Sequence, residues 1–69
     1  MKLSARNDFA GTVKTVTRGP VSTDVTVTIA PGIDVAAVIS TASADRLGLA
    51  AGKAAHVVIK ASSVMIGVD

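Results

Sequence analysis

Apolar and polar residues alternate along most of this 69-residue chain with the period of two that is typical of β-strands. The clearest example is DVTVTIA (residues 24–30), in which Val25, Val27 and Ile29 would face a core while the threonines face solvent. A Pro-Gly pair follows at residues 31–32 and predicts a turn. Residues 24–30 are therefore predicted to form the first strand of a β-hairpin.

The same pattern, with its interruptions, predicts the other elements. Strands are expected at residues 10–17, 33–40, 54–61 and 64–69, and one short helix at about residues 43–48. In the earliest strand, Gly11 would mark a bulge or a close approach of another backbone. The helix would begin at Ser43, a good N-cap, with Asp45 in its first turn. Gly48 or Gly52 would end it.

Five short strands with a helix between the third and the fourth match the order of an OB-type Greek-key barrel. We therefore predict an all-β fold, an OB-fold-like small barrel of five strands with one short helix. An SH3-like barrel is the alternative. The length of the chain predicts a single domain over residues 1–69.

The composition indicates that such a domain needs support beyond its own core. A domain near this size buries only about 60% of the surface that its unfolded chain exposes. Small domains therefore depend on disulfides, a metal ion or oligomerisation. The chain has no Cys and only one His, so disulfides and thiolate metal sites are excluded and few metal ligands remain. Because 49% of the residues are hydrophobic, we expect self-association.

Charge and hydropathy argue against nucleic acid and membranes as partners. The net charge is only +2, and the cations are scattered: Lys2, Arg6, Lys14, Arg18, Arg46, Lys53 and Lys60. Phe9 is the only aromatic residue, whereas single-strand binding of the OB type relies on aromatic platforms. No stretch approaches the 18 or more apolar residues of a membrane-spanning helix, and no apolar signal region follows Lys2. The expected location is the cytoplasm.

Nothing in the sequence predicts an enzyme. His56 is the only residue whose unperturbed pKa lies near neutrality, and it sits within an apolar strand without an evident partner. We interpret it as a strand residue that faces solvent or a neighbouring subunit. The carboxylates stand singly rather than in catalytic pairs: Asp8, Asp24, Asp34, Asp45 and Asp69.

Cations and hydroxyls occur together near both ends of the chain. Ser4 and Arg6 flank one alanine, and Lys60 and Ser62 flank another, so each pair points the same way in an extended segment. Hydroxyl donors with one or two cations suit a compact tetrahedral oxyanion. This mixture predicts a small anion site.

Further hydroxyls surround the predicted start of the helix. Ser40, Thr41 and Ser43 lie where free backbone N–H groups favour an anion. Capping alone would equally explain Ser43. Two alternatives to anion binding therefore stand: a structural assembly module whose serines only cap and solvate, and a single-strand nucleic-acid-binding module of the OB type.

Several motifs carry a more specific signal. They are SARN (4–7), GTV (11–13), GPV (19–21) before DVTV, SADRLGLAAGK (43–53) and VIKASSVMIGVD (58–69). Together they resemble the molbindin or Mop family of small molybdate-binding proteins, which is related to the TOBE domains of molybdate transporters and regulators. The resemblance covers essentially the whole chain, and the chain resembles the stand-alone form of the family.

The resemblance implies an OB-like fold and a homohexamer, a trimer of dimers, that holds oxyanions between subunits. The implied ligand is molybdate, with tungstate possible, and the implied role is intracellular molybdenum storage and homeostasis. No residue is expected to ligate a metal cation directly. The implied molybdate-binding residues are Ser4, Ala5, Arg6, Lys60, Ala61 and Ser62, completed by Ser40 and Ser43 of a neighbouring subunit.

Overall fold

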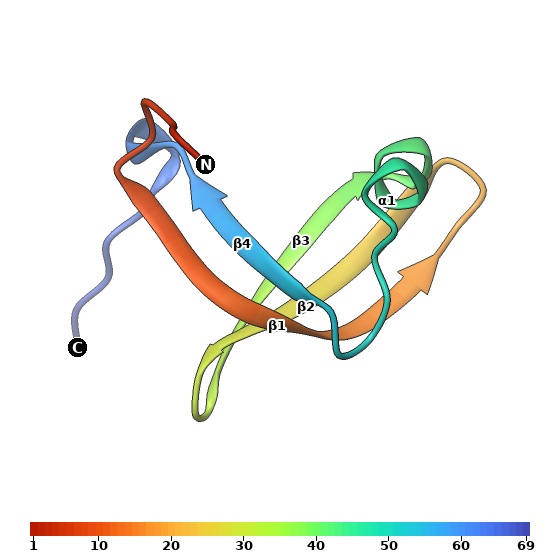
Figure 1. Cartoon of the computed structure of the whole chain (residues 1–69). Helices are drawn as coiled ribbons and strands as arrows, with labels where there is room; N and C mark the ends of the chain where they lie inside the picture. The colour runs from red at the N-terminus through yellow and green to blue at the C-terminus, as the bar shows by residue number, and fades with distance from the viewer.

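The computed structural model describes all 69 residues and shows one four-stranded antiparallel sheet in the order β3-β2-β1-β4 (Figure 1). The elements are β1 (Asn7–Arg18), β2 (Ser22–Ala30), β3 (Ile33–Ser40), α1 (Thr41–Leu47), β4 (Ala54–Ile59) and the 3₁₀ turn η1 (Ala61–Ser63). The prediction of an all-β fold with one short helix between the third and fourth strands is therefore confirmed. No helix is long and apolar enough to cross a membrane.

The hairpin of β2 and β3 forms as the alternation predicts. Val25 and Val27 are buried, and Thr28 pairs with Asp34 across the hairpin. Gly32 has a φ of 75°, a left-handed conformation that glycine adopts without steric cost. The Pro-Gly pair thus turns the chain, and the two strands share one apolar face.

Strand β1 is longer than predicted and serves two neighbours. It is strongly bent (Figure 1), so that its first half pairs with β4 and its second half with β2. A Cβ added to Gly11 would lie 2.5 Å from the carbonyl oxygen of Thr28, which confirms the predicted close approach. The bulge falls instead between Val13 and Thr15, where the register with β2 shifts.

The helix begins earlier than predicted. Ser40, not Ser43, is the N-cap, because its Oγ accepts a hydrogen bond of 3.1 Å from the backbone N–H of Ser43. Asp45 consequently lies beyond the first turn, where it forms an ion pair with Arg18 at the end of β1. Gly48, with a φ of 62°, ends the helix as expected.

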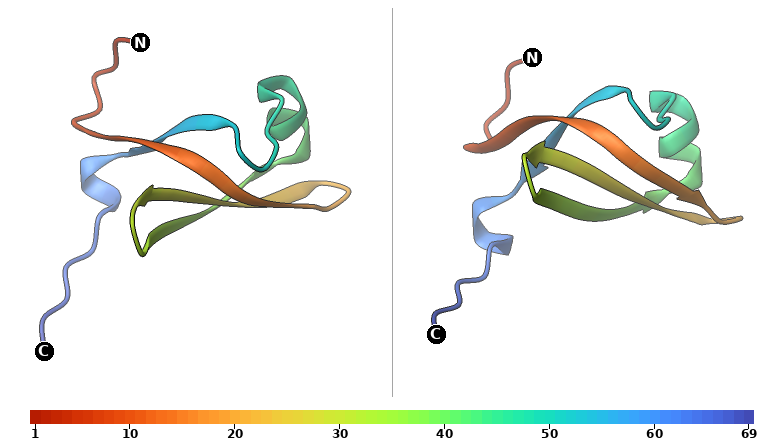
Figure 2. Two further views of the ribbon diagram at one scale, coloured as in Figure 1. Left: turned by 60° about the horizontal axis from the view of Figure 1, so that its bottom comes forward. Right: turned by 90° about the horizontal axis from the view of Figure 1, so that it is seen from below.

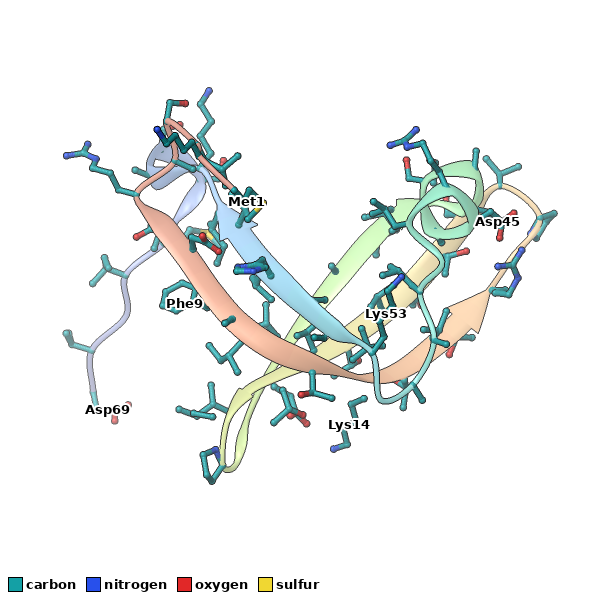
Figure 3. All side chains as sticks on the ribbon, viewed as in Figure 1. Met1, Phe9, Lys14, Asp45, Lys53 and Asp69 are labelled. Atoms are coloured by element: carbon teal, nitrogen blue, oxygen red, sulfur yellow. The ribbon has the colours of Figure 1, made fainter.

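The fifth predicted strand, residues 64–69, does not form. Residues 61–63 are a 3₁₀ turn after β4, and the chain then runs away from the sheet to Asp69 (Figures 2 and 3). The prediction of a closed five-stranded barrel is therefore wrong for one chain. The sheet is open because its two edge strands, β3 and β4, do not pair with each other.

An open sheet leaves a small core and a large exposed apolar face. Only five of the 69 residues are buried, and the core is formed by Val13, Val25 and Val27. Beside this core lies a groove of about 540 Å³, in which 12 of the 14 lining residues are hydrophobic. The expected shortage of core is thus visible in the fold.

Candidate anion-binding site

The start of β1 and the end of β4 meet at one end of the sheet. Asn7 pairs with Ile59 in the antiparallel register, so the residues before Asn7 and after Ile59 lie side by side. They line a pocket of about 460 Å³, formed by Ser4, Ala5, Arg6, Lys60, Ala61 and Ser62. The two segments that the family resemblance places in one site therefore come together within a single chain.

Neither segment belongs to a strand where it lines the pocket. Ser4 and Arg6 lie at bends before β1, so strand alternation does not explain why both reach the pocket. Lys60 keeps an extended backbone, with φ −61° and ψ 128°, and η1 follows directly. The backbone N–H of Ser63 donates to the carbonyl oxygen of Lys60 over 2.8 Å, which fixes the turn that carries Ser62.

The pocket carries two cations and no carboxylate. Arg6 and Lys60 take part in none of the ion pairs of the structure, which are Lys14–Asp34, Arg18–Asp45 and His56–Asp8. Among the lining residues only Ala5 is half-buried, and the others are exposed. The pocket is therefore an open, positively charged surface with hydroxyl donors on both sides, an arrangement that suits an anion.

Ser40 and Ser43 do not lie in this pocket. They stand at the start of α1, at the opposite end of the molecule from the first residues of the chain (Figures 1 and 2). Their hydroxyls bind each other, Ser40 Oγ donating to Ser43 Oγ over 2.8 Å. One chain consequently presents two separate groups of candidate residues.

Two of the ion pairs stabilise the fold far from the pocket. The ammonium group of Lys14 and the hydroxyl of Thr28 hold the pKa of Asp34 below its ordinary value. The guanidinium group of Arg18 likewise lowers the pKa of Asp45. This ion pair ties α1 to the end of β1. These carboxylates are thus occupied by partners outside the anion pocket.

Sequence reasoning missed one interaction near the pocket. His56 does have a partner, because its Nδ1 lies 2.9 Å from Oδ1 of Asp8. The two residues are 48 positions apart, and only the pairing of β1 with β4 brings them together. No local sequence signal marks this pair, because the register of strands so far apart in the chain is known only from the structure.

The donor set fits an anion rather than a metal cation. The structure contains no group of three or more His, Cys, Asp or Glu side chains that could hold a metal ion. Arginine, lysine and serine side chains offer hydrogen-bond donors and positive charge instead. The fold and the pocket therefore define a small β-domain with a positively charged surface that suits an anion.

The sequence places this domain in a known family. Residues 3–66 match the TOBE domain. The chain belongs to the TOBE domain family.

The chain matches the full length of one relative and only part of another. A "Probable molybdenum-pterin-binding protein" of Haemophilus influenzae is 41% identical over 69 residues, and the match covers 100% of both chains. The "Molybdenum transport protein ModE" of Herbaspirillum seropedicae is 46% identical over 69 residues, but the chain spans only 26% of its length.

A solved structure shares the fold. The cytoplasmic molybdate-binding protein ModG, in a form with molybdate bound, superposes with a TM-score of 0.94 at 40% sequence identity. The match covers 100% of this chain and 49% of that one. The backbone arrangement of this chain is therefore shared by about half of a protein described as molybdate-binding.

Proposed function

We propose that the chain binds molybdate reversibly and without catalysis, and tungstate at the same site. The observation that carries this proposal is the pocket between the start of β1 and the end of β4, which holds Arg6 and Lys60 without a carboxylate partner. The names of the relatives, which refer to molybdenum and molybdate, identify the anion among the tetrahedral oxyanions that such a pocket fits.

The chemistry of the pocket matches the charge of the ligand. Molybdate is a tetrahedral dianion, and the two cations of the pocket offset two negative charges. Among the lining residues, Ser4 and Ser62 would contribute hydroxyl donors, and Ala5 and Ala61 would contribute their backbone N–H groups. Hydrogen bonds and charge would hold an oxyanion without a covalent change in the ligand, which is what reversible binding requires.

The same proposal includes self-association, because one chain leaves its apolar groove uncovered. Val64, Met65, Ile66 and Val68 are exposed, the last three by 93%, 87% and 94%. This extended apolar segment has the length and character of a strand that would fill the gap between β3 and β4. We assign that role to residues 64–68 of a second copy, so that the five-stranded barrel closes between chains.

Assembly would also complete the anion site. Ser40 and Ser43 lie too far from the pocket to serve it within one chain, so they would contribute from a neighbouring copy. A homohexamer, built as a trimer of dimers, is the assembly that the family resemblance implies. The role that the family resemblance implies, intracellular molybdenum storage and homeostasis, requires reversible binding of this kind.

Isothermal titration calorimetry with sodium molybdate tests the proposal directly, with sodium tungstate as the second ligand and sodium sulfate as the comparison anion. We expect heat from molybdate and tungstate at micromolar anion. No heat from either would overturn molybdate binding. Light scattering on the same sample tests the assembly, and a hexamer that binds no oxyanion would favour a purely structural module instead.

A further inference from the structure

Asp8 is the only carboxylate on the paired segments of β1 and β4, and it lies beside the anion pocket. It stands opposite Val58 in the antiparallel register. His56 and Lys60 are each two residues from Val58, one on either side. Side chains two residues apart on a strand share a face, and Lys60 keeps an extended backbone. Asp8 therefore has two diagonal neighbours on β4 that can carry positive charge.

Diagonal neighbours of this kind are within reach of each other. Their Cα atoms lie about 7–8 Å apart across an antiparallel pair, a distance that long side chains span. Asp8 binds His56, with 2.9 Å between Oδ1 and Nδ1, and forms no ion pair with Lys60. Because an ionised carboxylate only accepts hydrogen bonds, the imidazole Nδ1–H is the donor. The carboxylate is thus held on the side away from the pocket.

We infer that His56 is a positioning residue for the anion site. By binding Asp8 it keeps that carboxylate away from Lys60, whose ammonium group then remains available to the anion. This inference rests on the proposed function, because it assigns His56 a part in the same pocket. It explains why a strand otherwise made of alanine, valine and isoleucine carries a single histidine.

Removal of His56 would change the partner of Asp8. The free carboxylate would pair with Lys60, since opposite charges on neighbouring strands attract. That pair would compete with the anion for the ammonium group and place a negative charge closer to the pocket. Exposed ion pairs are weak, so the expected cost is about a two- to fivefold loss of anion affinity.

The test is calorimetric titration of sodium molybdate into the full chain at one low ionic strength. Four proteins are compared: the wild type, His56→Ala, Asp8→Asn and the double variant with both changes. We expect His56→Ala to bind about two- to fivefold more weakly and the double variant to recover at least the wild-type affinity. His56→Arg, which retains a donor for Asp8, should keep the wild-type affinity.

Controls separate this role from a merely structural one. Asp34→Asn removes a carboxylate whose partner is Lys14, away from the pocket, and should leave the affinity unchanged. Thermal unfolding and light scattering show whether each variant keeps its fold and assembly. If His56 only joins β1 to β4, Asp8→Asn cannot restore what His56→Ala removes, because both variants lack the same bond.

The outcomes distinguish this inference from the proposed function. If the wild type binds molybdate and His56→Ala binds it with equal affinity, the inference is overturned and the proposed function stands. Equal weakening in His56→Ala and the double variant also overturns it. A wild type that binds no molybdate overturns the proposed function and this inference with it.

Discussion

Replacement of Lys60 by alanine is the sharpest probe of the proposed anion site. The change removes one of the two cations of the pocket and leaves Arg6 in place. Lys60 is exposed and forms no ion pair, and its only hydrogen bond, from the backbone N–H of Ser63, uses its carbonyl oxygen. Alanine keeps that carbonyl. The fold should therefore be unaffected, and any loss of affinity reports on the pocket itself.

The size of the loss depends on whether the pocket stays open. In an exposed site, an ionic contact contributes about 0.2–1 kcal/mol, which corresponds to a loss of at most about fivefold. In a site covered by a second chain, a hydrogen bond to a charged group contributes about 1.5–3 kcal/mol, or roughly 10- to 150-fold. We expect the larger effect, because the proposed assembly places Ser40 and Ser43 of another copy at the pocket.

Calorimetric titration of molybdate into Lys60→Ala measures this effect, with Lys14→Ala as the matched control. Lys14→Ala removes the same charge from the same residue type, but Lys14 lies on β1 outside the pocket (Figure 3). Its ammonium group there binds Asp34. The control should retain the wild-type affinity. Wild-type affinity in Lys60→Ala would remove Lys60 from the site, and an equal loss in both variants would show a general effect of net charge.

Three predictions concern the fold. Val13→Ala, at a side chain only 1% exposed, should lower the free energy of unfolding by about 1.5–3 kcal/mol in urea denaturation, and a loss below about 0.5 kcal/mol would contradict the assigned core. Gly11→Ala places a Cβ 2.5 Å from the Thr28 carbonyl oxygen and should cost about 1–3 kcal/mol, whereas unchanged stability would refute the close approach. Arg18→Gln should raise the pKa of Asp45 toward its ordinary value in an NMR titration. Because the folded pKa is lowered, Asp45 contributes stability above its unfolded pKa of about 3.9 and loses it as pH falls through the folded pKa. The wild type should therefore have a higher free energy of unfolding than Arg18→Gln at neutral pH, and the two values should converge in acid. The same difference in free energy at neutral and acid pH would argue against the Arg18–Asp45 pair.

Local patterns in the sequence predicted the parts of the fold that depend on local physics. The alternation in residues 24–30 and the following Pro-Gly pair were enough for the β2–β3 hairpin, because a hairpin requires only neighbouring residues. Gly48 was identifiable as a helix end because a left-handed residue is needed there. The start of α1 was harder, since Ser40 and Ser43 can both cap a helix and only the end of β3 decides between them.

The parts that were not predicted depend on partners distant in sequence. The apolar residues 64–68 look like a strand, but a strand needs an edge to pair with, and η1 directs them away from their own sheet. The Asp8–His56 pair likewise depends on the register of β1 with β4. The candidate site was predicted because its two segments combine cations with hydroxyls and match motifs of the molbindin or Mop family. Their assignment to molybdate stays a prediction.

The apolar groove and the anion pocket are both uncovered in a single chain, and the proposed second copy would complete both. If a second copy both covers the apolar groove and adds Ser40 and Ser43 to the pocket, the complete site exists only in the assembly. A ligand that binds only the assembled form stabilises it by mass action, by about 2.7 kcal/mol per site at a free concentration 100 times its dissociation constant. Molybdate would then strengthen the association of a chain whose own core holds only three buried valines. Anion binding and assembly would be reciprocal, so that dilution which separates the subunits would also release the stored anion.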